Sequence, residues 1–596
     1  MTWPESVDEA LSFGWIDGVR RRIDDESYSI LFTPRRRGSI WSAINIKRAT
    51  ELAKLGRMAP AGLRAFEARD EKKSAIYSYE NRPRELAPDY EKRFRANQKA
   101  WEFWSAQPPG YRRQVTYWVM EAKKEETRER RFMTLIDSSA HGRRIRGVLE
   151  KRRTGFSLSR DKLRAAMWQY TPRVAVIRGV RTPFAKSGTH YARLSALDLG
   201  KLAVTELVAR SGIDPKSIQE VIYGNVIPSV KAPNIAREIV LGTGLPRKIP
   251  GYTIGKACAS SNQAITSAAD LIFRGYADTV IAGGAESLSD VPILFSKNFA
   301  EALVGASKQK SVGGKLGQFT KLRPKDIAPD APAIAESTTG LTMGESAEKM
   351  AKENGITREA QDEFALQSHQ RAAAATASGR FKDEVMTVVV PPGFETIVET
   401  DNLIRGDTTL DALSKLRPVF DRKYGTLTAG NSSPLTDGAS AVLLMSEEKA
   451  KAEGRKPIGF IKSYAFAATD PFDQLLQGPV FALPTALERA KISLADIGVI
   501  EMHEAFAAQV LSNIQWIGSK RIAQEKLGRS EAIGQIDPEK INLTGGSIAL
   551  GHPFGATGAR IVTTVCNELQ RTGQQYGLVT VCAAGGIGVA MVLERE

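Results

Sequence analysis

Two patterns of hydrophobic and polar positions divide the chain. From about residue 173 onward, short apolar runs alternate with longer segments whose apolar residues recur at helical spacing. The runs 173–178, 220–224 and 278–282 predict strands, and the segments 194–209 and 357–378 predict amphipathic helices. This alternation predicts layered α/β structure with mostly buried sheets.

Before residue 170, helical spacing predominates. One strand is predicted at 28–33, where the Pro-Arg-Arg-Arg-Gly segment at 34–38 ends it. Helices are predicted at 42–55, 61–69, 98–106, 111–122 and 124–138. The first part therefore reads as a small α+β domain that is mostly helical.

The longest charge-free apolar stretch covers residues 576–593. It barely reaches the length of about 18 residues that suggests a membrane span. It also contains four glycines and one cysteine. Two buried strands around a glycine-rich turn are the better prediction.

Charge and tryptophan content sharpen the division. Residues 1–170 carry a net charge of +13 and the remainder only +3, and seven of the eight tryptophans lie in the first part. We expect a first domain at 1–150 and a linker at 151–170. Joining of two neighbouring genes is an alternative explanation, because Met167 would serve as a start codon for the second part. The intact mass of the native protein would distinguish the two.

The chain's first residues and its cysteines bear on its compartment. The first residues show no secretory signal and no arginine-rich transit peptide. Three cysteines in 596 residues do not suggest a disulfide framework. We expect a cytoplasmic protein of bacterial type.

Cys258 follows a small-residue turn and precedes a predicted helix that extends to about residue 274. The free N–H groups and the dipole of a helix N-terminus favour an anion. This position predicts a lowering of the thiol pKa by less than about one unit, so an imidazole would be needed for activation. A small buried hydrophobic residue is the alternative for a lone cysteine.

Two glycine-rich segments carry the other candidates. Residues 542–558 contain five glycines around His552, and glycine lets backbone approach a ligand closely. Residues 581–588 place Cys582 at the end of a predicted strand, where a turn can present N–H groups to an oxyanion. Taken alone, Cys582 is also explained as a core residue.

Together these segments closely resemble the thiolase family, over about 173–596. The likeness includes Arg-Thr-Pro-Phe at 181–184, Gly-Gly-Ala-Glu-Ser at 283–287, the segment 425–433 and His-Glu-Ala-Phe at 503–506. It implies a fold of two duplicated halves in a layered αβαβα arrangement. The halves are expected at 171–450 and 451–596, with a lid or loop insertion at about 288–340.

The resemblance implies roles for three catalytic residues. Cys258 would be the nucleophile that attacks the 3-keto carbon of a 3-ketoacyl-CoA, and His552 would take its proton. Cys582 would protonate the acetyl-CoA enolate that leaves, and would then deprotonate the incoming coenzyme A. In the synthetic direction, Cys582 would remove the α-proton of acetyl-CoA.

The resemblance also implies two oxyanion sites. The N–H groups of Cys258 and Ala584 would form one; His552, with a water or side chain held by His503 and Glu504, would form the other. Many thiolases have Asn where this chain has His503, and Gly where it has Ala584. The His-Glu-Ala-Phe form resembles the beta subunit of the trifunctional fatty-acid oxidation complex.

The resemblance gives two further residues a role, whereas the three other histidines are not assigned to the site. Met343 and Ser433 would line the pantetheine channel, although core packing is an alternative for Met343. His369 lies in a predicted amphipathic helix and is read as structural, and His190 and His141 carry no motif. We predict no metal ligands and no permanently bound cofactor, with coenzyme A as a substrate.

The expected activity is that of an acetyl-CoA C-acyltransferase, which cleaves 3-ketoacyl-CoA in fatty-acid β-oxidation. Biosynthetic formation of acetoacetyl-CoA is one alternative, and an inactive CoA-binding scaffold fused to a nucleic-acid-binding module is another. The resemblance further implies a homodimer. It also suggests that the basic segment 295–332 forms a lid that touches a hydratase/dehydrogenase alpha subunit or a membrane surface, with a solvated loop as the alternative.

In the first part, the segments 11–20 and 32–42 resemble the YdeI/OmpD-associated family, over about residues 4–146. That family supplies no chemistry for particular residues. Basic charge with interleaved tryptophans is compatible with nucleic-acid binding. A solvated cationic surface over an aromatic core is favoured, and nucleic acid is not expected as a partner.

Overall fold

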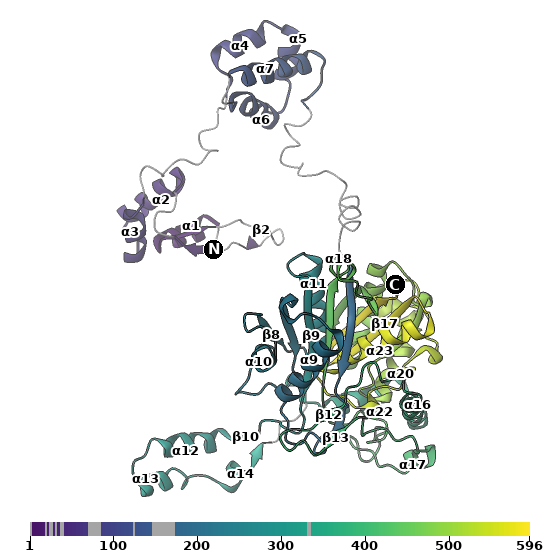
Figure 1. Cartoon of the computed structure of the whole chain (residues 1–596). Coiled ribbons are helices and arrows are strands. Elements are labelled where there is room, and N and C mark those ends of the chain that lie inside the picture. The colour runs from purple at the N-terminus through teal and green to yellow at the C-terminus, as the bar shows by residue number, and fades with distance from the viewer. Residues whose placement is uncertain are drawn as a thin grey trace. The chain divides into compact units, whose positions relative to one another are not determined.

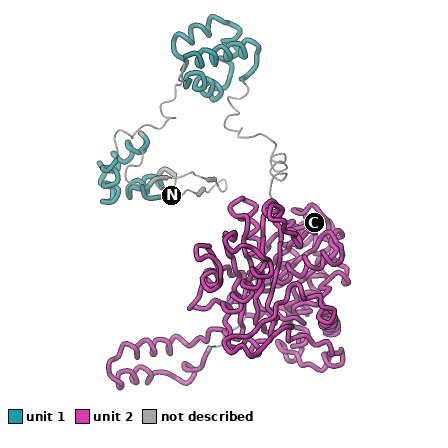
Figure 2. Tube along the Cα trace, viewed as in Figure 1, with its two compact units in different colours: residues 1–169 teal, residues 170–596 magenta. Residues whose placement is uncertain are grey.

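The computed structural model describes residues 3–17, 21–22, 28–29, 32–35, 41–69, 85–122, 125–145, 173–330 and 335–596. The chain divides into two compact units, residues 1–169 and 170–596 (Figures 1 and 2). Among the described residues, no helix has both the length and the apolar character needed to cross a membrane. The predicted linker at 151–170 lies outside the described residues.

The second unit is built on a ten-stranded sheet. Nine strands lie in the order β16-β17-β18-β15-β5-β14-β9-β7-β8, and β6 pairs with β14. Their bounds are β5 Val174–Arg181, β6 Ala185–Lys186, β7 Glu220–Gly224, β8 Gly251–Ile254, β9 Thr279–Glu286, β14 Thr436–Ser446, β15 Gly459–Ala468, β16 Ile497–Met502, β17 Tyr576–Ala583 and β18 Ile587–Glu594.

The strand pairing repeats itself in the two halves of the sheet. In the first half β5 is antiparallel to β14, β14 is antiparallel to β9, and β9 is parallel to β7. In the second half β15, β18, β17 and β16 pair in the same antiparallel, antiparallel, parallel sequence. A short antiparallel pairing of β5 with β15 joins the halves. The repeat agrees with the expected duplicated fold.

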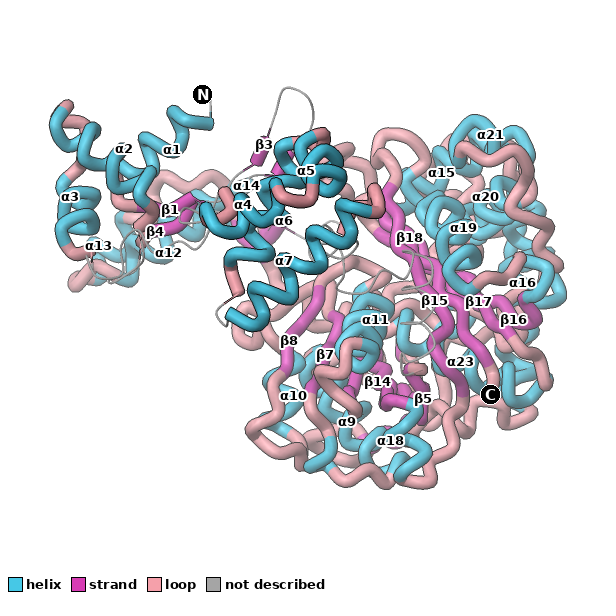
Figure 3. The backbone as a smooth tube through the Cα atoms, turned by 90° about the horizontal axis from the view of Figure 1, so that it is seen from above, coloured by secondary structure: helices cyan, strands magenta, loops and turns pink. Residues whose placement is uncertain are grey.

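Helices cover both faces of the sheet (Figures 1 and 3). The central helices α11 (Ser260–Phe273) and α23 (Thr557–Thr572) contact each other; α11 packs on strands of the first half, and α23 packs on strands of both halves. Their apolar side chains share one buried cluster with residues of β5, β9, β14, β17 and β18. Helix α9 (Ala196–Ser211) packs against β14, and α19 (Gly478–Ala490) packs against β15 and β18. The layered arrangement predicted from the alternating pattern is confirmed.

The remaining elements of this unit are shorter or more peripheral. The helices are α10 Ile235–Gly242, α15 Met343–Asn354, α16 Arg358–Ala377, α17 Leu410–Ser414, α18 Glu447–Ala452, α20 Ala507–Ile517, α21 Lys520–Leu527 and α22 Ser547–Leu550. The strands β12 (Val388–Val389) and β13 (Ile397–Val398) form a small antiparallel pair.

Capping residues explain why the predicted helix bounds were close. Ser195 and Thr342 form capping boxes at the starts of α9 and α15, and Thr357 caps α16. The stretch 576–593 forms β17 and β18 around a glycine-rich turn, as predicted. Its charge-free composition reflects two strands that are buried on both faces.

The insertion at about 288–340 contains more helix than was expected for a lid or loop. It comprises β10 Leu294–Phe295, α12 Lys297–Ser307, α13 Val312–Gly317, α14 Pro324–Ile327 and β11 Pro329–Asp330 (Figure 1). We call residues 294–330 the arm. The rings of Phe295, Phe299 and Phe319 contact one another in sequence, and Ser296 donates a hydrogen bond to the carbonyl of Asp326. The arm nevertheless leaves several large apolar side chains exposed, among them Leu303, Val304, Val312 and Leu316.

The first unit is mostly helical, as predicted. It contains α1 Trp3–Ser12, α2 Ala43–Lys54, α3 Pro60–Glu67, α4 Pro88–Arg95, α5 Gln98–Ser105, α6 Pro109–Met120 and α7 Glu125–Ala140. Its short strands are β1 Trp15–Asp17, β2 Arg21–Arg22, β3 Tyr28–Ser29 and β4 Phe32–Pro34. Two hydrophobic clusters form, one around Trp41 and Leu52 and one around Phe94 and Phe132.

The strand predicted at 28–33 is described only in part. Residues 28–29 lie in β3, which pairs with β2, and residues 32–33 lie in β4, which pairs with β1. Residues 30 and 31 lie outside the described residues. The described residues of the run are thus in strands, but periodicity alone does not reveal that they pair with different partners.

Candidate active site

Cys258 lies in the tight turn that joins β8 to α11. The N–H of Lys256 donates to Ser260 Oγ (2.8 Å), and this hydroxyl donates to the carbonyl of Ala257 (2.6 Å). Ala257 adopts a left-handed φ of +45°, which is unusual for a residue with a side chain. Helix α11 begins two residues after Cys258, so the predicted place near a helix N-terminus is confirmed. The turn leaves the Cys258 side chain partly exposed.

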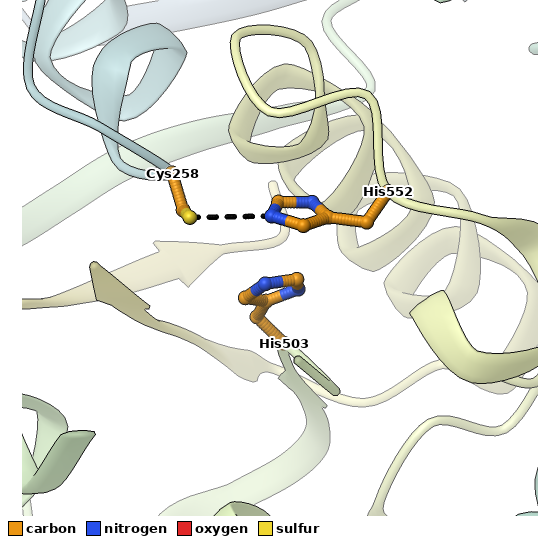
Figure 4. A group of neighbouring side chains, drawn as sticks. All are labelled: Cys258, His503 and His552. Carbon is orange, nitrogen blue, oxygen red and sulfur yellow. Dashed lines mark hydrogen bonds between the residues drawn. The ribbon is translucent and has the colours of Figure 1, made fainter. Parts of the chain in front are cut away.

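His552 lies between α22 and α23 in the second half, and its Nε2 is 3.2 Å from Cys258 Sγ (Figure 4). Its Nδ1 is 2.7 Å from Thr557 Oγ1, and that hydroxyl donates its hydrogen to the carbonyl of Pro553. Thr557 must therefore accept a hydrogen bond from Nδ1–H. The remaining lone pair of the neutral ring, on Nε2, faces the thiol.

Burial determines the charges of this pair. Burial raises the pKa of Cys258 to about 12, with a smaller increase from the carboxylate of Glu286. The N–H groups of Cys258 and Ala584 lower this pKa, but they do not outweigh burial. Burial also lowers the pKa of His552 to about 3, with a contribution from Arg560. The small lowering predicted for the helix end alone did not include burial, and the resting pair is a neutral thiol that donates to a neutral imidazole.

His503 follows β16, and its ring lies 4.1 Å from the His552 ring, measured between centroids (Figure 4). Its Nδ1 is 2.9 Å from Ser547 Oγ, and Arg560 Nη2 is 3.2 Å from the same oxygen. Arginine can only donate, so the Ser547 hydrogen is available to His503 Nδ1. This arrangement favours the tautomer in which the His503 proton is on Nε2, because the Ser547 hydrogen then has an acceptor.

The Nε2 atom of His503 is buried and has no hydrogen-bond partner among the described residues. A buried polar atom without a partner is costly, and such atoms often meet a ligand. Burial, with the charges of His552 and Arg560, holds the pKa of His503 well below its usual value. The ring is therefore a neutral N–H donor beside the Cys258–His552 pair.

Glu504 contacts the same loop but not the pair. Its carboxylate accepts hydrogen bonds from Asn542 Nδ2 (2.6 Å), Ser368 Oγ (2.8 Å) and the N–H of Ile548 (3.1 Å). A Cβ at Gly546 would meet this carboxyl group at 2.1 Å, so only glycine fits there. The contacts of Glu504 thus fix the start of α22, which carries Ser547.

Cys582 lies near the end of β17 and is buried. Burial, with a contribution from Cys258, raises its pKa well above the usual value. After β17 the chain turns through Gly585 and Gly586, whose φ angles are +78° and +71°. Ala584 is not among the positive-φ residues of the described chain, so alanine is tolerated where a glycine was expected. Its N–H lies beside the Cys258 thiol, as the effect on the thiol pKa requires.

Met343 and Ser433 lie around the same region. Met343 begins α15 and packs against a buried cluster that contains Cys582 and Phe506. The N–H of Ser433 donates to the carbonyl of Ala505, next to the loop that holds His503. Both side chains are partly buried. Their contact with a pantetheine chain stays a prediction.

Four residues of the site had no individual signal in the sequence. Ser547, Thr557 and Arg560 determine the tautomers of His503 and His552. Glu286 accepts hydrogen bonds from the N–H of Gly555 (2.9 Å) and from Asn225 (2.9 Å). Ser547 and Thr557 lie inside the predicted glycine-rich segment, and Glu286 lies inside the segment 283–287. The partners of Ser547 and Glu286 are distant in sequence, and Thr557 contacts His552 only five residues away, but no motif specifies any of these contacts.

The three remaining histidines lie outside this site. His190 and His141 are exposed. His369 is buried in α16, and its Nδ1 accepts a hydrogen bond from the N–H of Arg405 (3.1 Å). Burial, with the charge of Arg405, lowers the pKa of His369 to about 4. The structural reading of His369 agrees with these contacts.

The lowered pKa of His369 predicts a loss of stability in acid. The unfolded imidazole binds a proton near pH 6.5 and the folded one near pH 4, so stability is present above the first value and lost as the pH falls toward the second. The slope is about 1.4 kcal/mol per pH unit for each such imidazole. We expect His369→Gln, whose amide oxygen can accept the same N–H, to lose less unfolding free energy than wild type between about pH 7 and pH 4.5. Urea unfolding at both pH values measures this, and equal losses would contradict it.

A duplicated α/β fold that joins a partly buried cysteine to a buried histidine from its other half is typical of enzymes with a cysteine nucleophile. The chain matches the family description "Thiolase, N-terminal domain" over residues 174–448 and "Thiolase, C-terminal domain" over residues 455–595. It is 54% identical over 424 residues to the 3-ketoacyl-CoA thiolases of Yersinia pestis (strain Pestoides F) and Yersinia pseudotuberculosis serotype O:1b (strain IP 31758). Each comparison covers 71% of this chain and 97% of the relative. The chain belongs to the thiolase family.

Solved structures agree with this assignment. The acetyl-CoA acetyltransferase of Bacillus anthracis matches with a TM-score of 0.62 and 35% identity, over 72% of this chain and 99% of that one. Human mitochondrial 3-ketoacyl-CoA thiolase in complex with CoA matches with a TM-score of 0.60 and 32% identity, over 71% and 98%. The expected thiolase fold is confirmed.

The first unit matches two further families. Residues 83–142 match "Bacteriocin-protection, YdeI or OmpD-Associated", which confirms the expected resemblance there. Residues 1–65 match a domain of unknown function. The segments 11–20 and 32–42, on which the resemblance was based, fall within this second match.

Proposed function

We propose that the second unit cleaves 3-ketoacyl-CoA with coenzyme A, yielding acetyl-CoA and a shortened acyl-CoA in fatty-acid β-oxidation. The observation that carries this proposal is the 3.2 Å contact between Cys258 Sγ and His552 Nε2, made across the two halves of the fold. The 54% identity to proteins called 3-ketoacyl-CoA thiolase supports the cleavage direction over acetyl-CoA condensation.

The reaction begins with proton transfer from the Cys258 thiol to the free lone pair of His552. Both groups are neutral at rest, so the transfer occurs as Sγ attacks the 3-keto carbon and the carbonyl oxygen takes up the negative charge. The imidazolium then has N–H groups on both nitrogens, with Nδ1–H still bound to Thr557. An ion pair forms only during attack, which suits a buried site where unpaired charge is costly.

The first oxyanion site consists of the N–H groups of Cys258 and Ala584. Both lie beside Sγ, so an oxygen on the carbon that bonds to Sγ is within their reach. Loss of one such donor typically costs about 10²- to 10³-fold in rate. Backbone groups make this site insensitive to side-chain substitution, and the positive-φ glycines after Ala584 shape the turn that presents it.

Cleavage of the C2–C3 bond leaves the enolate of acetyl-CoA and an acyl group on Cys258. We assign Cys582 as the acid that protonates C2 of the enolate. The thiolate so formed takes the proton of the incoming coenzyme A, whose sulfur attacks the acyl-enzyme. The raised pKa of Cys582 keeps it protonated until the enolate forms.

We place the enolate oxygen at the second oxyanion site, beside the Nε2 atoms of His552 and His503. Proton uptake from Cys258 turns His552 Nε2 into a donor. His503 Nε2–H is a donor already, because Ser547 and Arg560 set its tautomer. Glu504 acts by holding the start of α22 and therefore the position of Ser547.

Ser547→Ala is expected to lower thiolysis by about tenfold, less than the roughly 10²- to 10³-fold loss expected for His503→Ala. Without the hydroxyl, His503 Nδ1 can take the proton and Nε2 then presents a lone pair to the enolate oxygen. Initial rates at saturating 3-ketoacyl-CoA measure the effect. The rate of Cys258 alkylation by iodoacetamide is the control and should not change, because the Cys258–His552 contact is retained. A wild-type rate in Ser547→Ala would show that Ser547 is not needed to orient the His503 N–H toward the enolate oxygen.

Coenzyme A enters as a substrate, and the proposal needs no permanently bound cofactor. We propose that Met343 and Ser433 line its pantetheine channel, because both lie around the Cys582 and His503 loops. Thiolysis assays across acyl lengths test the function. Acetyl-CoA formed from 3-ketoacyl-CoA of any length supports it, and no product with any length would overturn it.

We also propose a cytoplasmic homodimer whose arm contacts a hydratase/dehydrogenase alpha subunit or an anionic membrane surface. The arm's exposed apolar side chains and its basic residues support this proposal. The expected domain boundaries, 1–150 for the first domain and 171–450 and 451–596 for the two thiolase halves, are kept as part of the proposal. Nucleic-acid binding by the first unit is not part of it.

Charge reversal of Lys308, Lys310, Lys315 and Lys321 to Glu tests the arm. We expect binding to phosphatidylserine vesicles to fall more than about tenfold, because each basic side chain contributes about 1 kcal/mol near such a surface. Long-chain turnover should fall with it. Vesicle sedimentation and thiolysis of a long-chain substrate are the measurements. Unchanged vesicle binding, unchanged long-chain turnover and unchanged assembly with an alpha subunit would exclude this role.

A further inference from the structure

Cys258, His503 and His552 place one sulfur and two imidazole nitrogens within 4.8 Å of one another (Figure 4). Thiolate and imidazole together are a ligand set that suits zinc and similar thiophilic ions. Around a tetrahedral ion, such ligand atoms stand about 3.3–3.6 Å apart, given Zn–S of about 2.3 Å and Zn–N of about 2.0 Å. The Cys258–His552 separation of 3.2 Å is already close to that value.

Both imidazoles are anchored in the way that metal-binding histidines require. A second hydrogen bond on the other ring nitrogen fixes the orientation of a ligand histidine. His552 Nδ1 contacts Thr557 Oγ1 at 2.7 Å, and His503 Nδ1 contacts Ser547 Oγ at 2.9 Å. Each ring thus presents Nε2 toward the same space, where His503 Nε2 has no partner among the described residues.

We propose that these three side chains form an inhibitory binding site for a thiophilic divalent cation such as Zn²⁺. Cys258 loses its proton to solvent and binds as a thiolate, and His552 binds through its Nε2 lone pair. The His503 proton moves from Nε2 to Nδ1, where Ser547 Oγ accepts it, and Nε2 becomes the third ligand. A water completes the tetrahedron.

The inference goes beyond the thiolase activity because the ion would occupy the nucleophile and the second oxyanion site together. Cys258 is partly exposed while both imidazoles are buried, so the ion would enter from the nucleophile's side. His503 is the residue that completes the set, since an amide in its place is a poor ligand for zinc. Mg²⁺ and Ca²⁺ prefer oxygen ligands and should not compete.

Binding of Co²⁺, a spectroscopic substitute for Zn²⁺, tests the site in the full chain without any substrate. We expect one Co²⁺ per chain with a thiolate-to-cobalt charge-transfer absorption. Cys258→Ala should lose this absorption. His503→Asn and His503→Gln should weaken binding by more than the roughly 10- to 100-fold that loss of an outer-shell partner costs. His190→Asn, which removes an exposed histidine elsewhere, is the matched control and should bind like wild type.

The outcomes separate this inference from the proposed reaction. Absence of the charge-transfer band at saturating Co²⁺, its persistence in Cys258→Ala, or unchanged affinity in both folded His503 variants would overturn it. In wild type, Zn²⁺ should inhibit thiolysis, EDTA should restore it, and Mg²⁺ should have no effect. A chain that binds Co²⁺ as expected but shows no thiolysis would contradict the proposed function and leave the metal site standing.

Discussion

Cys258→Ala is expected to lower thiolysis by at least about 10⁴-fold, which is the order of loss when a catalytic nucleophile is removed. Without Sγ no acyl-enzyme forms, and neither His552 nor Cys582 can replace the covalent step. Acetyl-CoA production from 3-ketoacyl-CoA and CoA, followed by chromatography, measures the loss.

Cys566→Ala is the matched control for this experiment. Cys566 is buried in α23 and packs among apolar residues of the central cluster. Its removal deletes a thiol that is more deeply buried than Cys258 and should leave turnover within about twofold, because volume loss in a core affects stability more than chemistry. Comparable losses in the two variants would show that Cys258 matters for folding and not as a nucleophile.

Cys582→Ala is expected to lower thiolysis by about 10²- to 10⁴-fold, the usual contribution of a positioned acid or base. The enolate would lack its proton donor, and the incoming coenzyme A would lack its base. The specific readout is exchange of the C2 protons of acetyl-CoA with deuterium from D₂O, which should disappear in the variant.

Alkylation of Cys258 by iodoacetamide controls for damage to the site. It should proceed in Cys582→Ala at the wild-type rate, because the nucleophile and its contact with His552 remain. Deuterium exchange at the wild-type rate in Cys582→Ala would rule out Cys582 as the base.

Secondary structure was predicted best where a local sequence signal, such as a helix cap or a glycine-rich turn, marks the element. The helix 357–378 begins at its Thr357 cap, and the glycines of the charge-free stretch 576–593 favoured two buried strands over a helix. At 28–33 the described residues are in strands, but they pair with different partners, which a short apolar run does not specify. The arm was expected as a lid or loop, yet serine caps at Ser296 and Ser311 start α12 and α13 within it.

The motif-bearing members of the site could be predicted from the sequence, but the electrostatics of the site could not. The order of the motifs indicated that Cys258, His552 and Cys582 belong to one site. In the structure Cys258 contacts His552, and Cys258 also contributes to the raised pKa of Cys582. The sequence predicted only the small lowering of the thiol pKa by the helix end, which is a local feature, whereas the larger increase from burial depends on both halves of the fold. The tautomers of His503 and His552 depend on Ser547 and Thr557, whose hydroxyl contacts no sequence pattern specifies.

Close contacts between backbone segments also could not be predicted from the sequence. Gly284 in β9 lies so near the carbonyl of Gly555 that a Cβ there would come within 1.8 Å of the oxygen. The sequence displays both glycines in its motifs, but not that they meet. Their contact, together with the hydrogen bond from Gly555 to Glu286, holds the His552 loop against the half that carries Cys258. The meeting of the two halves thus creates the site.

Mass spectrometry of the chain after brief mixing with a 3-ketoacyl-CoA, without free coenzyme A, tests whether Cys258 carries the acyl group. A covalent mechanism at Cys258 predicts a mass increase equal to the shortened acyl group, located on the peptide that contains Cys258 and removed when coenzyme A is added. It also predicts no such adduct in Cys258→Ala. An acyl group on a different residue, or acetyl-CoA released without any adduct on Cys258, would contradict it.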